Sequence, residues 1–253
     1  MADPAAGRGR TPAAIVTGVS RGLGEALAAD LLRRGFDVVG LGRGSSPKLA
    51  GARFRFVESD LAHPARIAAA LVPALRELAA RRPASVTLIN NAAVAGPVGL
   101  IGRLDAAEVE AAIATNIAAP LVVADLFLRT FADDAVPRRV INISSGAAQR
   151  ALAGSGAYSM AKAAIEMLTL SLAADHAAPN FRAIALRPGI FETAMQQFMR
   201  SRDPAEFPSV ELFRGFKAQR LLKDPADVAA RIVAKLVLEP VDHGRVYVHT
   251  DLD

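Results

Sequence analysis

The sequence predicts a single α/β domain, with a doubly wound, mostly parallel sheet of seven strands and helices on both faces. Short apolar runs of strand length alternate along the chain with longer segments whose apolar residues recur at helical spacing, a pattern typical of parallel sheets. A length of 253 residues fits one such domain. Hydrophobic residues make up 52% of the chain and charged residues 22%, so there is enough apolar material for a buried core.

The elements follow one another in a regular order. The first strand runs into a glycine-rich turn and a helix that Gly35 ends. Residues 1–12 are rich in Gly, Pro and Arg and are expected to form a flexible tail, with the domain over 13–253 and a loop-rich substrate segment at about 190–223. Expected strands lie at 13–17, 36–41, 54–57, 85–89, 139–143, 182–186 and 246–248, and expected helices at 25–34, 64–81, 106–131, 157–176 and 225–238.

Composition excludes several classes of protein. Without cysteine the chain has no disulfide, thiolate metal site or cysteine nucleophile, and a cytoplasmic location is expected. The four histidines are scattered, so no metal site is expected. The formal charge is +5, but basic residues are spread along the chain and only 5% of residues are aromatic, so no nucleic-acid partner is expected. Polar residues and Pro120 interrupt the most apolar stretch, 111–128, so no membrane contact is expected.

The first expected strand ends in a turn with three glycines in the spacing Gly-x3-Gly-x-Gly. Glycines at a strand-to-helix turn let the backbone approach a pyrophosphate, and the helix N-terminus supplies N–H groups and a favourable dipole. The alternative is a tight connection without a ligand. A Rossmann-type dinucleotide site at this turn involves Gly18, Ser20, Arg21, Gly22, Leu23 and Gly24.

The end of the second expected strand bears on the choice of dinucleotide. An acidic residue there favours the ribose 2′-hydroxyl of NAD(H), whereas a basic residue favours the 2′-phosphate of NADP(H). Arg43 ends this strand and Arg21 lies in the glycine turn, which points to NADPH/NADP+ unless both arginines are merely solvated. Asp60, with Leu61, follows the third strand and is predicted either to contact the adenine amino group or to cap the loop before Pro64.

A second group of polar residues follows the strand at 139–143. Ser145 lies just beyond its carboxyl end, where ligands bind in open α/β sheets. Tyr158 and Lys162 are one helical turn apart in the next expected helix, so the ammonium can lie near the phenol and lower its pKa. An arbitrary Tyr-x-x-x-Lys is usually only an amphipathic helix surface. The chain has only two tyrosines and five lysines, and with the upstream serine this spacing favours acid–base chemistry.

These motifs resemble the short-chain dehydrogenase/reductase family over residues 13–248, and they occur in the family's order. Within the family, the segments 142–148, 188–195 and 244–247 are most similar to sepiapterin-reductase-like enzymes, especially the benzil reductases that form (S)-benzoin. The resemblance rests on Thr17-Gly18 through Gly24, Asn90-Asn91-Ala92-Ala93, Asn116, Ser145, Tyr158 with Lys162, and Pro188-Gly189 with Thr193.

The resemblance implies a role for each matching residue. Tyr158 donates a proton to the substrate's carbonyl oxygen as hydride arrives from the nicotinamide, and Ser145 hydrogen-bonds that oxygen. Lys162 lowers the pKa of Tyr158 and holds the nicotinamide ribose hydroxyls. Asn116 supports a water that relays protons to Lys162, unless it is an ordinary residue of a helix bend. The resemblance also implies cofactor contacts from Asn90, Ala92, Pro188, Gly189, Ile190 and Thr193.

Two departures from the family pattern bear on the site. Ala93 stands where the family motif ends in glycine, which adds a methyl near the cofactor. The last strand reads Tyr247-Val248-His249, with the nearest carboxylate at Asp251, whereas sepiapterin-type enzymes carry an aspartate there that grips the pterin. A pterin substrate is therefore not expected. The segment 191–216 is rich in Phe and Met and is predicted either to cover the site as a lid or to fill core under a long loop.

The resulting hypothesis is an NADPH-dependent carbonyl reductase acting on a small-molecule ketone or 1,2-diketone. One alternative is a reductase of the same family that acts on 3-oxoacyl, steroid or sugar carbonyls. Another is a non-catalytic NADPH-binding scaffold. Because the family commonly dimerises or tetramerises through the helices that carry Asn116 and Tyr158, the resemblance implies a homodimer or homotetramer.

Overall fold

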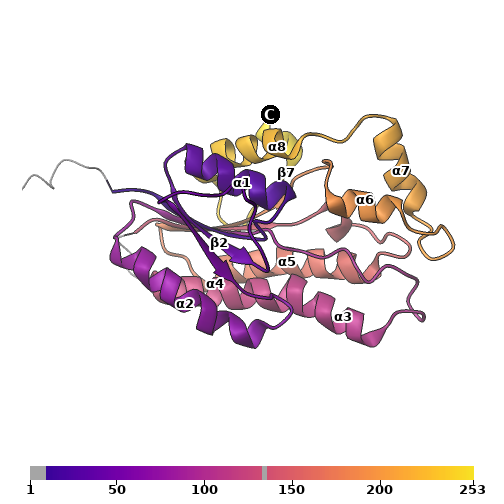
Figure 1. The fold of residues 1–253 in the computed structure, drawn as a ribbon, viewed down its shortest axis with the longest axis horizontal. Helices are drawn as coiled ribbons and strands as arrows, with labels where there is room; N and C mark the ends of the chain where they lie inside the picture. The colour runs from indigo at the N-terminus through magenta and orange to yellow at the C-terminus, as the bar shows by residue number, and fades with distance from the viewer. Residues whose placement is uncertain (1–9, 133–135) are drawn as a thin grey trace, which may run out of the picture.

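A computed structural model describes residues 10–132 and 136–253 (Figure 1). Its centre is a seven-stranded sheet in the order β3-β2-β1-β4-β5-β6-β7, and every strand pair is parallel. The α/β architecture predicted from the sequence is confirmed, and the sheet is entirely parallel. The strands are β1 Ala13–Thr17, β2 Asp37–Gly42, β3 Phe54–Glu58, β4 Val86–Asn90, β5 Arg138–Ile143, β6 Phe181–Arg187 and β7 Val246–Val248.

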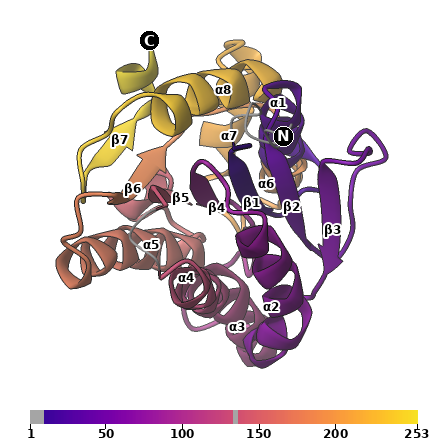
Figure 2. The same ribbon diagram turned by 90° about the vertical axis from the view of Figure 1, so that its left-hand side faces the viewer.

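Helices cover both faces of the sheet because consecutive parallel strands need crossover connections. Figure 2 shows α1 and α8 on one face and α2, α4 and α5 on the other. The apolar sides of these helices form two buried clusters, one on each face of the sheet. The helices are α1 Gly22–Arg33, α2 Pro64–Ala80, α3 Ala106–Ile113, α4 Ala119–Thr130, α5 Gly156–Asp175, α6 Ala194–Arg200, α7 Val210–Ala218 and α8 Pro225–Ile232.

Two of the expected helices contain a wider turn. The run expected at 106–131 is continuous, but a π-helical turn, Ala114–Ala118, joins α3 to α4. Likewise α8 continues into a π-helical segment, Val233–Leu238. Hydrophobic periodicity does not reveal such turns, because one extra residue shifts the apolar positions only slightly.

The stretch expected to be loop-rich, 189–223, contains two helices, α6 and α7. Thr193 begins α6, since its side chain accepts a hydrogen bond from the Gln196 N–H at 3.2 Å. The two helices share a small apolar cluster of their own in which Met199, Phe207 and Val210 are buried. They span only seven and nine residues, so a helical period is hard to recognise there in the sequence. Figure 1 shows both at one end of the molecule.

The apolar run Ala106–Thr130, with a mean hydropathy of 1.8, is long and apolar enough to cross a membrane by length and composition alone. In the structure Ala119, Val123 and Phe127 of this run belong to the core cluster beneath the sheet. The side of α4 that carries these residues is therefore explained by packing within the domain.

The order of the strands predicts at which end of the sheet a ligand binds. The chain moves outward from β1 to β2 and β3, then returns to β4 on the other side of β1. A ligand crevice in open α/β sheets forms where the order reverses, outside the carboxyl ends of the strands. Here that point lies between β1 and β4.

Candidate active site

The glycine-rich turn lies at this reversal point, between β1 and α1. Gly18 and Gly22 have φ values of +77° and +63°, a conformation that side chains other than glycine rarely adopt. A Cβ on Gly24 would overlap the carbonyl oxygen of Gly18, so α1 packs directly against the turn. No side chain caps the start of α1 at Arg21. No side chain competes for its first N–H groups, which suits a pyrophosphate at this helix N-terminus.

Thr17 and Asn91 join the ends of β1 and β4. The Thr17 hydroxyl accepts hydrogen bonds from the backbone N–H groups of Asn91 and Ala92, both at 2.9 Å. The Asn91 side chain donates back to the Thr17 carbonyl at 2.9 Å. These contacts place Ala92 beside Gly18, whose added Cβ would come within 3.1 Å of the Ala92 Cβ. The sequence motifs contain both residues, but their pairing across two strands appears only in the fold.

Arg21 lies within the turn, and Arg43 directly follows β2. The end of β2 lies beside the turn, because a Cβ on Gly42 would be 3.8 Å from the Cα of Gly18. Both arginines are exposed. Among residues 10–132 and 136–253, neither has a hydrogen-bond or ion-pair partner for its guanidinium group. These two cations are thus free to meet an anionic group next to the glycine turn.

The segment after β2 is tied to α1 by Glu25. Its carboxylate accepts a hydrogen bond from Ser46 and pairs with Lys48 at 3.5 Å. Sequence reasoning did not identify these three residues. They hold the chain that follows Arg43 against the helix.

Asp60 and Leu61 lie beyond the end of β3. The Asp60 carboxylate accepts a hydrogen bond from the Ala62 N–H at 3.0 Å, the turn-capping arrangement that was one of its two predicted roles. Leu61 is buried in the core cluster that includes α2. Asp60 is exposed, and an adenine contact from it stays a prediction.

Asn90 has its side chain inside the protein rather than in the crevice. Its amide donates to the Asn142 oxygen at 2.9 Å, and Asn142 in turn donates to the Thr169 hydroxyl at 2.9 Å. All three residues are buried. This polar chain links β4, β5 and α5, and a cofactor contact from Asn90 stays a prediction.

Ser145, Tyr158 and Lys162 come together at the carboxyl end of β5. The hydroxyl groups of Ser145 and Tyr158 share a hydrogen bond. The Lys162 Nζ lies 5.6 Å from the centre of the Tyr158 ring and donates to the Ile143 carbonyl at 2.7 Å. Two hydroxyls and an amine thus form one cluster, as the spacing of these residues predicted.

The pKa values in this cluster shift in an unexpected direction. Burial raises the pKa of Tyr158 to about 12, and the hydrogen bond with Ser145 opposes the increase only in part. Burial lowers the pKa of Lys162 to about 8. The net shift of the Tyr158 pKa is therefore upward and not downward as expected, because desolvation is the largest contribution and the Lys162 amine is held by the Ile143 carbonyl.

Asn116 occupies the π-helical turn between α3 and α4. Its amide is buried and makes two hydrogen bonds to the backbone of Val94, one accepted from the N–H at 2.8 Å and one donated to the carbonyl at 2.9 Å. Asn116 thus fixes the segment after β4 next to the crevice. The water relay implied by the resemblance stays a prediction.

The residues after β6 contact both the glycine turn and the residue that follows β7. Thr193 lies against the glycine turn, since a Cβ on Gly22 would be 3.6 Å from its methyl group. Gly189 has a φ of +79°, and a Cβ there would lie 3.0 Å from the His249 ring. Pro188 is buried, and Ile190 accepts a backbone hydrogen bond from Lys223 at 3.2 Å. The segment from 188 to 193 thus spans the crevice between α1 and β7.

Three polar residues beside the cluster of Ser145, Tyr158 and Lys162 were not identified from the sequence. Arg187 donates two hydrogen bonds to the Glu166 carboxylate, at 2.8 and 2.7 Å. Ser144 donates a third at 2.6 Å. Burial alone raises the pKa of Glu166, but these hydrogen bonds and the Arg187 charge outweigh it and hold that pKa below its usual value. The one available signal was the position of Glu166, one turn after Lys162.

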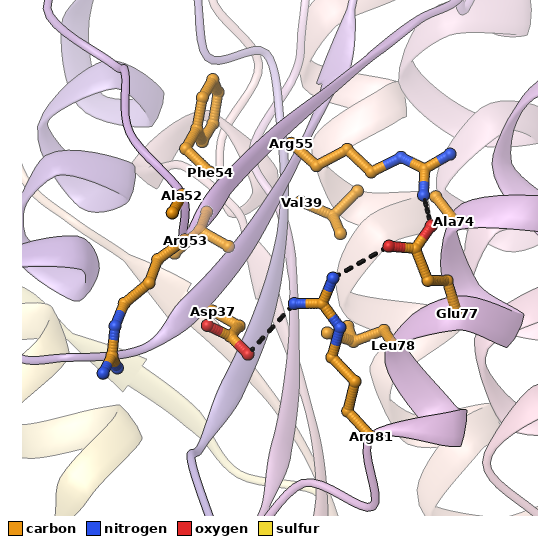
Figure 3. A pocket seen from close by; sticks show the side chains of 11 residues that line it. Asp37, Val39, Ala52, Arg53, Phe54, Arg55, Ala74, Glu77, Leu78 and Arg81 are labelled. Carbon is orange, nitrogen blue, oxygen red and sulfur yellow. Dashed lines mark hydrogen bonds and ion pairs between the residues drawn. The ribbon is translucent and has the colours of Figure 1, made fainter.

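Two cavities lie at the opposite, amino edge of the sheet. The first, about 230 Å³, lies between the start of β2 and the end of α2, where Arg55, Glu77, Arg81 and Asp37 form a chain of ion pairs (Figure 3). The second, about 270 Å³, lies below β4, β5 and β6. Neither contains a residue of the cluster described above, so they are separate from the chemistry at the carboxyl edge.

Comparison with known proteins decides the family. The sequence profile of the short chain dehydrogenases matches residues 12–204. The chain belongs to this family. The family consists of oxidoreductases. The parallel sheet and the grouping of Ser145, Tyr158 and Lys162 agree with this membership.

Individual relatives narrow the comparison. The chain is 28% identical over 235 residues to a benzil reductase ((S)-benzoin forming) from Bacillus subtilis, which covers 92% of this chain and 96% of the relative. It is 35% identical over 211 residues to a sepiapterin reductase from Meriones unguiculatus, covering 75% and 79%. A short chain dehydrogenase/reductase of Saccharomyces cerevisiae, 26% identical, superposes with a TM-score of 0.80 over 95% of this chain and 96% of its own.

Proposed function

We propose that this short chain dehydrogenase is an NADPH-dependent carbonyl reductase that reduces a ketone or a 1,2-diketone. The observation that carries the proposal is the cluster of Ser145, Tyr158 and Lys162 at the carboxyl end of β5, beside a glycine turn suited to a dinucleotide. When bound, the dihydronicotinamide supplies the hydride. The chain's own residues supply the proton and the hydrogen bonds to the substrate oxygen.

Tyr158 is suited to act as the proton donor. A phenol whose pKa is about 12 is fully protonated at neutral pH. It donates its proton to the carbonyl oxygen as the carbonyl carbon accepts hydride, so that the product is a neutral alcohol. Ser145 hydrogen-bonds the same oxygen and stabilises the negative charge that develops on it. The Lys162 ammonium beside the ring favours the phenolate that remains.

The preference for NADPH rests on Arg21 and Arg43. Both guanidinium groups are exposed beside the glycine turn, and no carboxylate of the described chain is paired with either. A ribose 2′-phosphate carries about two negative charges, and charge-assisted hydrogen bonds to it contribute about 1.5–3 kcal/mol each. With a neutral 2′-hydroxyl the same two arginines form no charge–charge interaction, so they stabilise bound NADH less than bound NADPH.

The proposed substrate class rests on the apolar cover that α6 and α7 provide. Met199, Phe207 and Val210 form its buried core, and the partly exposed side chains of Met195 and Phe213 pack against that core. Such a surface suits an aryl or other apolar carbonyl compound. The likeness to benzil reductases supports the same class. His249 follows β7, in the region where the resemblance gives sepiapterin-type enzymes a pterin-binding aspartate, so we do not propose a pterin.

A substrate panel tests the proposal. NADPH consumption is followed with benzil and related diones, and in parallel with a 3-oxoacyl thioester, a ketosteroid and a sugar ketone. Fastest turnover of the diones supports the proposal, and fastest turnover of another group assigns the same chemistry to that group. Tight NADPH binding without turnover of any carbonyl would instead indicate the non-catalytic scaffold.

We also propose that the chain assembles as a homodimer or homotetramer in the cytoplasm. Leu121 on α4 and Met160, Met167 and Leu170 on α5 are exposed, although they are apolar. These two helices lie next to each other on the outside of the molecule (Figure 2). Light scattering during gel filtration gives the mass, and charged substitutions at Met167 and Leu170 should produce monomers.

A further inference from the structure

Glu166 occupies a central position beside the proposed catalytic cluster without belonging to it. Its carboxylate receives three hydrogen bonds, two from Arg187 at the end of β6 and one from Ser144 at the end of β5. The side chains of Glu166 and Arg187 are 15% and 16% exposed. One carboxylate therefore joins the ends of two strands to the helix that carries Tyr158 and Lys162.

The hydrogen bond between Ser144 and Glu166 is one of several contacts that hold α5 against the end of β5. Four consecutive residues, the last two of β5 and the two that follow it, each contact a residue of α5, and the last pair includes the proposed proton donor. The four pairs are Asn142 with Thr169, the Ile143 carbonyl with Lys162, Ser144 with Glu166, and Ser145 with Tyr158. The distances of the first three are 2.9, 2.7 and 2.6 Å.

Ser145 and Tyr158 depend on this alignment because they lie on different elements. Ser145 follows β5, Tyr158 is in the first turn of α5, and the chain between them makes a short 3₁₀ helix, Gly146–Ala148, and an irregular loop. The hydroxyl pair therefore forms only if α5 keeps its place along β5. Ser144, the immediate neighbour of Ser145, is fixed on its backbone side as well, since its N–H donates to the Leu186 carbonyl at 2.7 Å.

Arg187 extends the same arrangement toward the cofactor side of the crevice. It immediately precedes Pro188 and Gly189, the start of the segment that spans the crevice. Burial opposes the charge on Arg187, but its hydrogen bonds to Glu166 are stronger and raise its pKa. Both groups are thus ionised at neutral pH, and the pair is fixed by two parallel hydrogen bonds.

We propose that Glu166, through Ser144 and Arg187, is a positioning residue that sets the place of Ser145 against Tyr158 for proton transfer. The inference rests on the proposed reductase function, and it adds the group that orients the catalytic hydroxyls. Glu166 contacts neither hydroxyl itself. Its loss should therefore lower the rate of the chemical step and leave dinucleotide binding at the glycine turn intact.

The test compares Glu166→Gln with Glu77→Gln. Glu77 is a matched control, because its carboxylate also binds two cations, Arg55 and Arg81, at the far edge of the sheet (Figure 3). For Glu166→Gln we expect a decrease in kcat of about 10- to 100-fold, the range that a displacement of about 1 Å produces. KM for the carbonyl substrate and Kd for NADPH should stay within about threefold. Glu77→Gln should match the parent in every value.

Two further variants cover the case in which Glu166→Gln does not fold. Ser144→Ala removes one hydrogen bond and keeps the ion pair, and Arg187→Gln removes the partner cation. Both should lower kcat in the same way as Glu166→Gln. In the double variant Glu166→Gln with Arg187→Gln the two losses should not multiply, because the residues act as one unit. Losses that multiply fully, or a kcat within twofold of the parent in all variants, would overturn the proposal.

A spectroscopic measurement separates this inference from the proposed function. The chain has only two tyrosines, so fluorotyrosine labelling gives two ¹⁹F resonances, which Tyr247→Phe assigns. The resonance of residue 158 should move in Glu166→Gln and remain unchanged in Glu77→Gln, with no substrate or dinucleotide present. If the parent reduces no carbonyl but this shift occurs, the reductase function fails and the positioning role stands. An unchanged resonance together with an unchanged kcat contradicts the positioning role.

Discussion

At the scale of single residues, burial sets the protonation states that the chemistry needs. Tyr158 and Lys162 lie in one cluster, and desolvation moves their pKa values in opposite directions, to about 12 and about 8. Both shifts favour the uncharged forms. Because the phenol stays protonated far above neutrality, the group whose charge changes first with increasing pH is Lys162.

The pH dependence of reduction should therefore follow Lys162. We expect kcat for carbonyl reduction to fall above a pH of about 8, where the ammonium loses its proton, and to show no separate fall at the usual phenol value of 10. The measurement is kcat from pH 6 to 10. A rate that is constant through pH 9 would contradict the assignment, and Tyr247→Phe, which leaves the cluster intact, is the control.

The pKa shifts of Lys162 and Tyr158 also make the free energy of unfolding depend on pH. Between about 8 and 10.5 the unfolded chain keeps a proton on Lys162 that the folded chain has lost, so the free energy of unfolding rises with pH in this range. Tyr158 acts in the reverse direction between 10 and about 12, where only the folded chain keeps the phenolic proton. Urea unfolding at pH 8 and 10 should show the increase in the parent chain and a smaller one in Lys162→Met. Equal increases in both proteins would refute this assignment.

Arg43 should determine the choice of dinucleotide. Loss of one charge-assisted contact of about 1.5–3 kcal/mol corresponds to a 10- to 100-fold weaker affinity. For Arg43→Ala we therefore expect Kd for NADPH to increase by about that factor and Kd for NADH to change little. Fluorescence titration with both dinucleotides measures this. Arg53→Ala, at the amino edge of the sheet, is a matched exposed control. Equal losses for both dinucleotides would count against a 2′-phosphate contact.

At the scale of elements, α6 and α7 are the helices that the sequence predicted least well. They replace an expected loop, and their apolar residues form a separate cluster above the carboxyl edge of the sheet. Of the two predicted roles of this segment, the local core is confirmed, since Phe207 is fully buried and a Cβ on Gly154 would lie 2.8 Å from its ring. A cover over the site stays a prediction.

Truncation of Phe207 should affect the substrate rather than the cofactor. Phe207→Ala removes a buried ring, a change that typically costs about 3–5 kcal/mol of packing, and we expect the loss to loosen α6 and α7 while the sheet remains folded. KM for an aryl diketone should increase at least tenfold, with Kd for NADPH nearly unchanged. Steady-state kinetics and NADPH titration measure both values. An unchanged KM would show that α6 and α7 do not contact the substrate.

At the scale of the whole molecule, the alternation of strands and helices predicted the parallel sheet because central strands such as β1 and β4 are buried along their whole length and read as largely apolar runs. The cluster of Ser145, Tyr158 and Lys162 was predictable because strand ends and helical turns have fixed spacing. The pairing of Glu166 with Arg187 was not, because it joins two elements 21 residues apart. The pKa of Tyr158 also escaped prediction, since burial is a property of the packed structure.

The most direct test of the account measures NADPH oxidation with benzil by the parent chain and by Tyr158→Phe. The phenylalanine keeps the ring and removes only the hydroxyl, so Kd for NADPH and the thermal midpoint should stay near the parent values. Loss of a general acid lowers a rate by about 10²- to 10⁴-fold, and we predict a decrease in kcat of that size. A Tyr158→Phe protein that reduces benzil at the parent rate would contradict the central claim.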